Sequence, residues 1–424
     1  MAALSSDASS PPWADLPVEM VDAVVERLDV LSAARLAAVC SSWAAAVATN
    51  PALPFGTPCL LMASEELNIF EEDTFELMDL TDAGEGGWEQ PDPPPALMWG
   101  VAWGQQWVGG KDDWLATVDK HGDARLVNPY TGQRVELPDI SAVVSGDKTR
   151  ATFIRIVVCE TPSSGTGAAG YLVVAVVGKG VLAIARGGDD GWTALKNPVD
   201  GNQFYCSDVV VHKGKVVAVD FYGVVHSWNI EHACASDAEP ELKPPPPPPH
   251  DDELDGFEFR WRLAESADGR RLVLVRIYGN RTDPNPRAYG HRMYLYSDSY
   301  HAEGVRVYER NVDDAVAGDD GGGWNPVVGF GDDSLFLGLN YPFLARVVDR
   351  YSPGAYWVQL RPNCVCVTYN HSSVWSEHFD CDMQVFSLGN KGCSFRSSCL
   401  FPTDRCSYRT PMWFRPVLKN YELE

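Results

Sequence analysis

Between residues 16 and 47 the apolar residues recur at steps of three and four, which is the spacing of one face of an α-helix. A first apolar stripe consists of Leu16, Met20, Val24, Val25 and Leu28. A second stripe consists of Leu36, Val39, Cys40, Trp43 and Val47. Pro17 suits a first helical turn, where the N–H that proline lacks would have no partner, and Asn50-Pro51 ends the pattern. The pattern predicts a small unit of short helices.

Beyond Pro58 the chain changes to short runs of Val, Leu, Ile and aromatic residues, separated by Gly, Asp, Asn and Pro. Runs such as WLATVD at Trp114, KVVAVD at Lys215 and RRLVLVRIY at Arg270 have the length of strands. Strand, glycine turn and strand recur at irregular spacing, because long polar insertions intervene. Such hairpins, without amphipathic helices of comparable clarity, predict a mainly β domain over residues 57–418.

Four-stranded units of about 40–50 residues would divide this domain into a β-propeller of about seven blades. Two packed sheets are the alternative. The segment 235–256 stands out, because it holds six consecutive prolines, seven acidic residues and a single lysine. That composition predicts a mobile loop. We also expect residues 1–12 to be disordered.

The formal net charge of the 424 residues is −24. A surface this negative repels phosphate groups, which makes nucleic acid and anionic membranes poor partners. No stretch approaches the roughly 20 apolar residues of a membrane-spanning helix. The N-terminus also lacks the basic and apolar regions of a secretory signal. We therefore expect a protein of the cytoplasm, the nucleus or both.

Common catalytic signatures are missing from the sequence, since it contains no G-x-S-x-G elbow, no H-E-x-x-H and no phosphate-binding G-x-x-x-x-G-K-[ST]. We accordingly expect no enzyme activity, no catalytic residue and no cofactor. A zinc site is conceivable from Cys364, Cys366, His371, His378 and Cys381. However, a C-x-C pair on a strand places both sulfurs on one face and lacks the turn of C-x-x-C. We interpret the pair as core residues and expect no metal.

The stretch LPVEMVDAVVERLDVLSAARLAAVCSSWAAAV resembles the F-box. The features that match are Leu-Pro, an acidic residue, an apolar pair before a leucine, a leucine in the second helix, Val-Cys and a tryptophan. In this chain they are Leu16-Pro17, Glu19, Val24-Val25, Leu28, Leu36, Val39-Cys40 and Trp43. Valine stands at 24 and 25 where isoleucine and leucine are usual, and the third helix is rich in alanine. The resemblance implies a three-helix F-box over residues 13–52.

Downstream, the chain looks like the plant F-box proteins whose C-terminal half is a KIB-type β-propeller domain. The matching stretches follow the family's order over most of residues 100–418. They are LVNPYTGQRVELP, SDVVVHKGKVVAVDFYGVVHSW, LAESADGRRLVLVRIY, VRVYER, GDDSLFLGLN, RPNCVCVTYN and MWFRPVL. The resemblance implies that residues 57–418 form such a domain.

Together these resemblances imply a substrate-recognition subunit of a Skp–cullin–F-box ubiquitin ligase, with no chemistry on the chain itself. The F-box would bind the Skp-type adaptor, and through it cullin, while propeller loops bind an unidentified target protein. A helical unit of about 40 residues buries too little surface to be robust alone, which also favours docking. The expected adaptor-binding residues are Leu16, Pro17, Met20, Val24, Val25, Leu28, Leu36, Val39, Cys40 and Trp43.

Two alternatives stay open. A diverged F-box that no longer recruits the ligase would leave a protein-binding module, which adaptor binding would distinguish. An enzyme that uses the centre of the propeller would need a cluster of histidine and carboxylate in a deep channel. The sequence also leaves open which of the ten residues contact the adaptor and which hold the helices together. Trp43 suits either role equally.

Overall fold

The computed structural model divides into two compact units, and each is described by itself. The first comprises residues 1–56 and 416–424, and the second comprises residues 57–415. The structure describes residues 16–25, 27–28, 33, 36–37, 39–49, 58–63, 75–79, 106–119, 121–128, 133–140, 143, 153–162, 170–178, 180–198, 204–233, 248, 251–281, 300–311, 323–347, 360–368, 383–389 and 412–415. Within these ranges no helix is both long and apolar enough to cross a membrane.

The first unit contains the helices α1 (Val18–Val25) and α3 (Ser41–Thr49). Helix α1 begins directly after Pro17, whose carbonyl accepts hydrogen bonds from the N–H groups of Met20 and Val21. Of the three expected helices, the described residues contain these two in full, and residues 36–37 are helical as well. The core of the unit is made of small side chains: Val21, Val25, Ala33, Ala37, Ala44, Ala46 and Val47.

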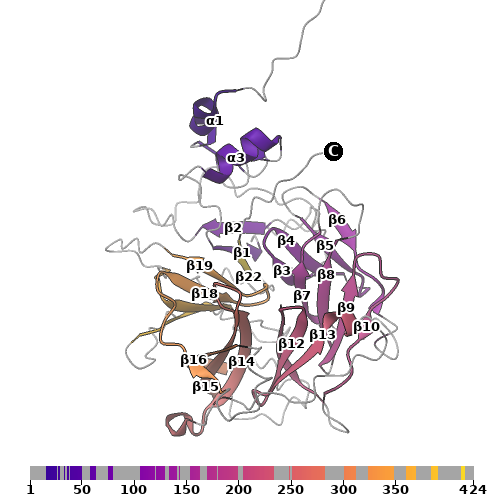
Figure 1. Ribbon diagram of the computed structural model, residues 1–424, viewed down its shortest axis with the longest axis vertical. Coiled ribbons are helices and arrows are strands. Elements are labelled where there is room, and N and C mark those ends of the chain that lie inside the picture. Colours follow the sequence, from indigo (N-terminus) through magenta and orange to yellow (C-terminus); the bar gives the residue numbers. More distant parts are fainter. Residues whose placement is uncertain are drawn as a thin grey trace, which may run out of the picture. The chain divides into compact units, whose positions relative to one another are not determined.

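The second unit consists of small sheets, of which five are called blades 1 to 5 here (Figure 1). Blade 1 contains β3 (Gln106–Lys111), β4 (Trp114–Val118), β5 (Ala124–Val127) and β6 (Arg134–Glu136). Blade 2 contains β7 (Phe153–Glu160), β8 (Leu172–Val177), β9 (Val181–Arg186) and β10 (Thr193–Ala194). In both blades each strand pairs antiparallel with the next strand of the chain.

Blades 3 and 4 repeat this meander. Blade 3 contains β11 (Cys206–His212), β12 (Lys215–Asp220) and β13 (Val225–Asn229), and the short helix α4 (Ile230–Ala233) follows it. Blade 4 contains β14 (Glu258–Glu265), β15 (Arg271–Arg281), β16 (Tyr300–Asn311) and β17 (Asn325–Pro326). The strands β3, β7, β11 and β14 each begin a blade, and neighbours among them contact one another.

Blade 5 departs from the meander. It contains β18 (Asp333–Leu337), β19 (Phe343–Arg346), β20 (Cys364–Thr368) and β21 (Met383–Ser387), and its strands β18 and β20 run parallel. A further sheet joins the two ends of the unit, because β1 (Cys59–Ala63) pairs with both β2 (Phe75–Asp79) and β22 (Met412–Phe414). We call it the closing sheet.

Contacts between consecutive sheets close the ring. Buried side chains of blade 4 and blade 5, such as Val275 and Leu335, belong to one hydrophobic cluster. The closing sheet contacts blade 5 through the rings of Trp413 and Phe336, whose centroids are 4.8 Å apart. It contacts blade 1 through Arg415, whose Nη2 lies 2.9 Å from a carboxylate oxygen of Asp112. The unit is therefore a β-propeller.

The expected propeller in a mainly β chain is confirmed, but the expected count of about seven blades is wrong. The described residues form five blades and the closing sheet. The expected count of seven came from dividing the full length of the domain by the length of one blade. Stretches such as residues 80–105 add to that length and lie outside the described sheets.

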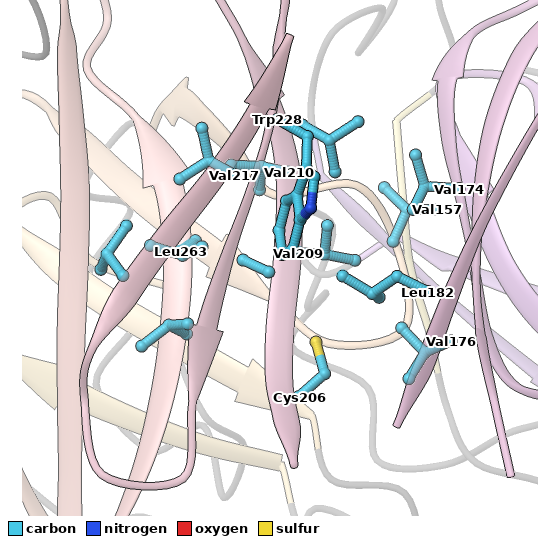
Figure 2. Close-up of a cluster of buried hydrophobic side chains, with 14 of the residues drawn as sticks. Val157, Val174, Val176, Leu182, Cys206, Val209, Val210, Val217, Trp228 and Leu263 are labelled. Carbon is cyan, nitrogen blue, oxygen red and sulfur yellow. The ribbon is translucent and has the colours of Figure 1, made fainter. Parts of the chain in front are cut away.

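The core of the propeller lies between the faces of neighbouring blades (Figure 2). Trp228 is completely buried there, beside valine and leucine side chains from blades 2, 3 and 4. Its indole N–H donates to the carbonyl of Lys196 at 3.1 Å, so the one polar atom of the ring is satisfied. Burying each large apolar side chain contributes about 1.5–3 kcal/mol, which makes these interfaces the main source of stability.

The C-terminal end of the proline-rich segment is anchored to blade 4. Residues Asp252–Leu254 form a 3₁₀ turn, and the Leu254 side chain is buried. The Arg306 guanidinium pairs with Asp251 and Glu253 at 3.3 and 3.5 Å. Charge-paired and buried groups thus hold residues 251–254 against blade 4, and the mobility expected of the segment 235–256 stays a prediction. Most of residues 235–250 lie outside the described ranges.

Candidate functional site

Among the described residues of the helical unit, four large apolar side chains are exposed. They are Val18, Met20, Val24 and Val39, whose exposed fractions are 53%, 58%, 48% and 52%. Three of them lie on α1, whose other two valines, Val21 and Val25, are buried in the core of the unit. An apolar surface that the unit's own core does not use is suited to a protein partner.

Burial divides the ten residues expected to contact the adaptor. Val25 is completely buried, and four others pack half-buried against the same core: Leu16, Leu28, Leu36 and Trp43. Pro17, Met20, Val24 and Val39 are exposed, and Cys40 is half-buried. The exposed residues are accessible to a partner, whereas the first group packs in or against the core of the unit.

Val18 is an exposed residue that the sequence pattern missed. It lies outside the stripe of three- and four-residue steps that begins at Leu16. Steps of three and four residues do connect Val18 with Val21, Val25 and Leu28, but such a stripe reports which residues can share a face and not which face the partner helices cover. Val18 lies in the first turn of α1 and is exposed to a similar extent as Met20.

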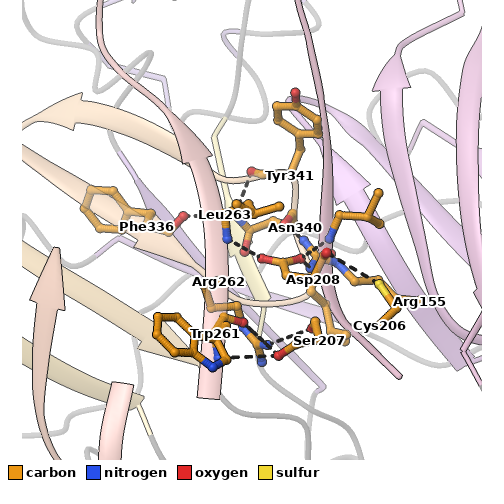
Figure 3. Close-up of polar contacts among 12 residues, drawn as sticks. Arg155, Cys206, Ser207, Asp208, Trp261, Arg262, Leu263, Phe336, Asn340 and Tyr341 are labelled. Atoms are coloured by element: carbon orange, nitrogen blue, oxygen red, sulfur yellow. Dashed lines mark hydrogen bonds and ion pairs between the residues drawn. The ribbon is translucent and has the colours of Figure 1, made fainter. Parts of the chain in front are cut away.

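A buried ion pair links neighbouring blades of the propeller (Figure 3). Arg155 of blade 2 donates through Nη1 to the carboxylate of Asp208 in blade 3. Its Nη2 and Nε donate to the carbonyls of Asn340 and Leu339 at 2.8 and 3.3 Å. Asp208 accepts another hydrogen bond, at 2.9 Å, from the backbone N–H of Leu263 in blade 4. Each charge is thus paired and hydrogen-bonded, which buried charges require.

The segment that follows β18 extends this network to the remaining blades. The backbone N–H of Tyr341 donates to the carbonyl of Gly110 in blade 1 at 2.6 Å. Asn340 is buried and donates through Nδ2 to the carbonyl of Tyr341 at 2.8 Å. Arg155 and Asp208 are buried as well. The network therefore ties all five blades together. Its polar side chains Arg155, Asp208 and Asn340 are buried, so none of the three is exposed to a ligand.

A histidine and a carboxylate converge where two inner strands end. His212 is the last residue of β11 and is completely buried, and its Nδ1 lies 2.8 Å from Oε1 of Glu265, the last residue of β14. The Tyr341 hydroxyl donates to the carbonyl of Val211 at 2.8 Å and lies 3.4 Å from Glu265 Oε2. The Lys111 ammonium group lies 4.2 Å from the centroid of the Tyr341 ring.

This cluster is arranged to hold blades together. Burial raises the pKa of the Tyr341 hydroxyl well above its ordinary value, so the hydroxyl stays protonated and is a poor nucleophile. Its proton already serves the Val211 carbonyl. His212, Glu265 and Tyr341 come from blades 3, 4 and 5, so their contacts cross two blade boundaries. The geometry fits a structural role better than a general base beside a nucleophile.

The pair Cys364 and Cys366 lies on β20, and both side chains are buried in one hydrophobic cluster. This confirms the interpretation of the two cysteines as core residues on one face of a strand. Burial also raises the pKa of the Cys366 thiol well above its ordinary value, which disfavours the thiolate that a metal would need. His371, His378 and Cys381 lie outside the described residues.

Two aromatic side chains at the turn between β12 and β13 are exposed. The exposed fractions of Phe221 and Tyr222 are 39% and 75%, and their rings meet edge to face with centroids 5.9 Å apart. The carboxylate of Asp220 fixes the turn, because it accepts hydrogen bonds from the N–H groups of Tyr222 and Val224 at 2.8 and 2.9 Å. This turn was not among the expected contact residues, although two adjacent aromatics before a turn glycine are visible in the sequence.

Two family models match the chain. The KIB1-4 β-propeller model matches residues 91–393, and the F-box domain model matches residues 13–52. The first covers more than two thirds of the chain, and the order of the domains is the one expected from the sequence. F-box and β-propeller domains are typically adaptors without catalytic activity. No curated protein matches the chain.

Solved structures share low sequence identity with this chain. AztD from Citrobacter koseri is 11% identical with a TM-score of 0.30, and the match covers 65% of this chain and 61% of AztD. The Cps50 (Swd1) β-propeller domain from Myceliophteria thermophila is 9% identical with a TM-score of 0.36, and the match covers 81% and 90%. The N-terminal domain of Nup159 is 10% identical with a TM-score of 0.34, and the match covers 80% and 72%. At this level of similarity the fold rests on the sheet topology of the chain itself.

Proposed function

Because this chain belongs to the KIB1-4 β-propeller family and carries an F-box ahead of the propeller, we propose that it is the substrate-recognition subunit of a Skp–cullin–F-box ubiquitin ligase. The F-box binds the Skp-type adaptor, and through it cullin, while the propeller binds the protein to be ubiquitinated. The chain positions that target and performs no chemistry. Catalysis belongs to the ubiquitin-conjugating enzyme that the assembly brings near.

One observation carries the proposal, namely the four exposed apolar side chains on a helical unit that has its own core. Leaving Val18, Met20, Val24 and Val39 in water forgoes the stabilisation that burial would contribute, about 25 cal/mol for each Å² of apolar surface. Binding to the adaptor buries these side chains and so recovers that stabilisation. Because the core residues of the unit are a different set, the contact surface can be altered without unfolding the helices.

The separation of exposed residues from core residues in the helical unit provides a test of adaptor binding. In the full-length chain, Met20→Asp with Val24→Asp should weaken binding to a purified Skp-type adaptor by at least about 2 kcal/mol, as hot-spot changes at other interfaces do. The affinity is measured by isothermal titration calorimetry. The matched control is Val328→Asp, which alters a propeller side chain that is 87% exposed and should leave the affinity unchanged.

The second candidate function is a protein-binding module whose diverged F-box no longer recruits a ligase. Valine at positions 24 and 25 and the alanine-rich third helix are the features that favour it. Absence of adaptor binding by the unmodified chain would establish this alternative. If the adaptor affinity is unchanged in Met20→Asp with Val24→Asp, the contact lies on another surface of the chain.

A further inference from the structure

An arginine of blade 4 is buried among aromatic rings. Arg276 lies on β15 and is only 5% exposed. Its guanidinium carbon lies 4.8 Å from the ring centroid of Trp261, 5.3 Å from that of Phe259 and 5.4 Å from that of Tyr308. The negative faces of aromatic rings attract cations, so the three rings fix the position of the guanidinium. We call these four side chains the Arg276 site.

The packing of blade 4 on blade 3 holds the rings of the Arg276 site in place. Trp261 and Tyr308 are buried in a hydrophobic cluster that includes residues of both blades, and Phe259 packs against the same cluster. The backbone of Gly223 in blade 3 lies against the Trp261 ring, since a Cβ at position 223 would come within 2.6 Å of it. The site is therefore preorganised, and a ligand that binds it has few side chains to order.

A proline of the chain itself contacts the Arg276 site. Pro248 is buried, and its carbonyl accepts a hydrogen bond from Nη2 of Arg276 at 3.5 Å. Pro248 belongs to the run of six prolines at 244–249. Residues 251–254 follow shortly after it and are held on blade 4 by the buried Leu254 side chain and the contacts of Arg306.

Proline suits this site because of the groups that it offers and the one that it lacks. Burial lowers the pKa of Arg276, because water solvates the buried cation poorly. A guanidinium has only donors, so a group that packs beside it is best one that supplies acceptors. Proline supplies a carbonyl and an apolar ring, and it has no backbone N–H that would itself need an acceptor.

The acidic residues near the site contact a different arginine. Asp251 and Glu253 pair with Arg306 at 3.3 and 3.5 Å. The hydrogen bond from Arg276 goes instead to the neutral carbonyl of Pro248. Recognition at the Arg276 site therefore uses ring contact and a carbonyl acceptor, and it needs no charge on the ligand.

A proline-rich segment repeats these groups along its length. Consecutive prolines form a polyproline II helix, which has three residues per turn and leaves every carbonyl without an internal hydrogen bond. The helix is formed before binding, so it loses little conformational entropy when it docks in an aromatic-lined groove. Such a segment is thus the ligand whose chemistry matches the rings and the donor of the Arg276 site.

From these observations we propose that the Arg276 site is a recognition site for proline-rich segments, that Pro248 occupies it within the chain, and that a proline-rich segment of a partner protein competes for it. The inference does not rest on adaptor binding, since all of its residues belong to the propeller. The short connection from residues 251–254 keeps Pro248 at an effective concentration on the order of millimolar. A partner segment therefore binds the unmodified chain weakly and binds tightly once the internal prolines are removed.

The experiment measures fluorescence anisotropy of a labelled decaproline titrated with two full-length proteins. One is the unmodified chain, and in the other alternating glycine and serine replace the six prolines at 244–249. We expect the replaced chain to bind decaproline at least about tenfold more tightly, because its internal competitor is gone. A decapeptide of alternating glycine and serine and one of alternating glutamate and alanine should not bind.

Further substitutions in the replaced chain locate the binding. Arg276→Lys keeps the charge but loses the planar guanidinium, and it should weaken decaproline binding about tenfold or more. Phe259→Ala truncates a half-buried ring and should weaken binding as well, which provides a second variant if Arg276→Lys fails to fold. Thermal unfolding of each variant shows which of them are folded.

Pro326→Gly in the unmodified chain is the matched control, because Pro326 is an exposed proline of β17 in the same blade. It should leave decaproline binding as weak as in the unmodified chain. Equal decaproline affinity of the unmodified and replaced chains would overturn the proposal. So would binding of the glutamate peptide in place of decaproline, or decaproline binding that folded Arg276→Lys and Phe259→Ala variants retain in full.

Discussion

At the scale of single residues, the buried ion pair of Arg155 and Asp208 requires both side chains to be present. The side chains are only 9% and 1% exposed, so neither charge has water to solvate it. Their hydrogen bonds to Asn340, Leu339 and Leu263 compensate for that loss. Removing one partner leaves the other charge buried without compensation, which is far more unfavourable than removing both.

We therefore expect Arg155→Met to lower the free energy of unfolding by about 3–5 kcal/mol. Urea unfolding followed by tryptophan fluorescence measures it. The control is Arg346→Met, because Arg346 pairs with Asp332 at 2.6 Å while both side chains are more than 70% exposed. Such a pair contributes less than about 1 kcal/mol. Similar losses in the two variants would show that Asp208 is solvated in the folded chain.

At the scale of elements, packing decides what a local pattern leaves undetermined. The apolar stripe of α1 correctly predicted a helix, but neighbouring helices decided that Val25 is buried and Val24 exposed. The turn from β12 to β13 shows the same dependence. Its positive φ at Gly223 is a local property, whereas the ring of Trp261 that excludes a Cβ comes from the next blade.

Substitution of two turn glycines separates these effects. Gly223 and Gly214 both have positive φ, of 85° and 73°, but only Gly223 faces another group within 4 Å. Gly214→Ala should cost about 1 kcal/mol through backbone strain alone. Gly223→Ala adds the clash with Trp261 and should cost about 1–3 kcal/mol more. Equal thermal midpoints for the two variants would mean that the Trp261 ring moves away freely.

At the scale of the whole propeller, stability depends on closing the ring. The first and last strands of the unit meet in the closing sheet, where Leu60 on β1 pairs in register with Trp413 on β22. Both side chains are completely or almost completely buried. The closing sheet contacts blade 5 on one side and blade 1 on the other, so an opened ring would expose two blade faces to water.

Trp413→Ala should accordingly lower the free energy of unfolding by about 3–5 kcal/mol, the usual loss for truncating a buried aromatic side chain. We expect the propeller to unfold in one transition, with fluorescence and circular dichroism changing together. Trp413→Phe keeps a ring against Phe336 and should cost less. An early transition confined to part of the signal in Trp413→Ala would show that the blades are stable without closure.

The sequence by itself determined the division into helices and then strands, the placement of Cys364 and Cys366 in a core, and the family. The first two depend on local periodicity, which a strand or a helix displays within a few residues, whereas the family was recognised from motifs that the sequence shares with it. The tertiary structure alone decided the number of blades, the exposed face of the helical unit and the network around Arg155. The partners of Arg155 lie 53 and 185 residues away in the chain, and no local pattern encodes a contact at that separation. Ring closure brings them together because each blade must cover the apolar face of the next.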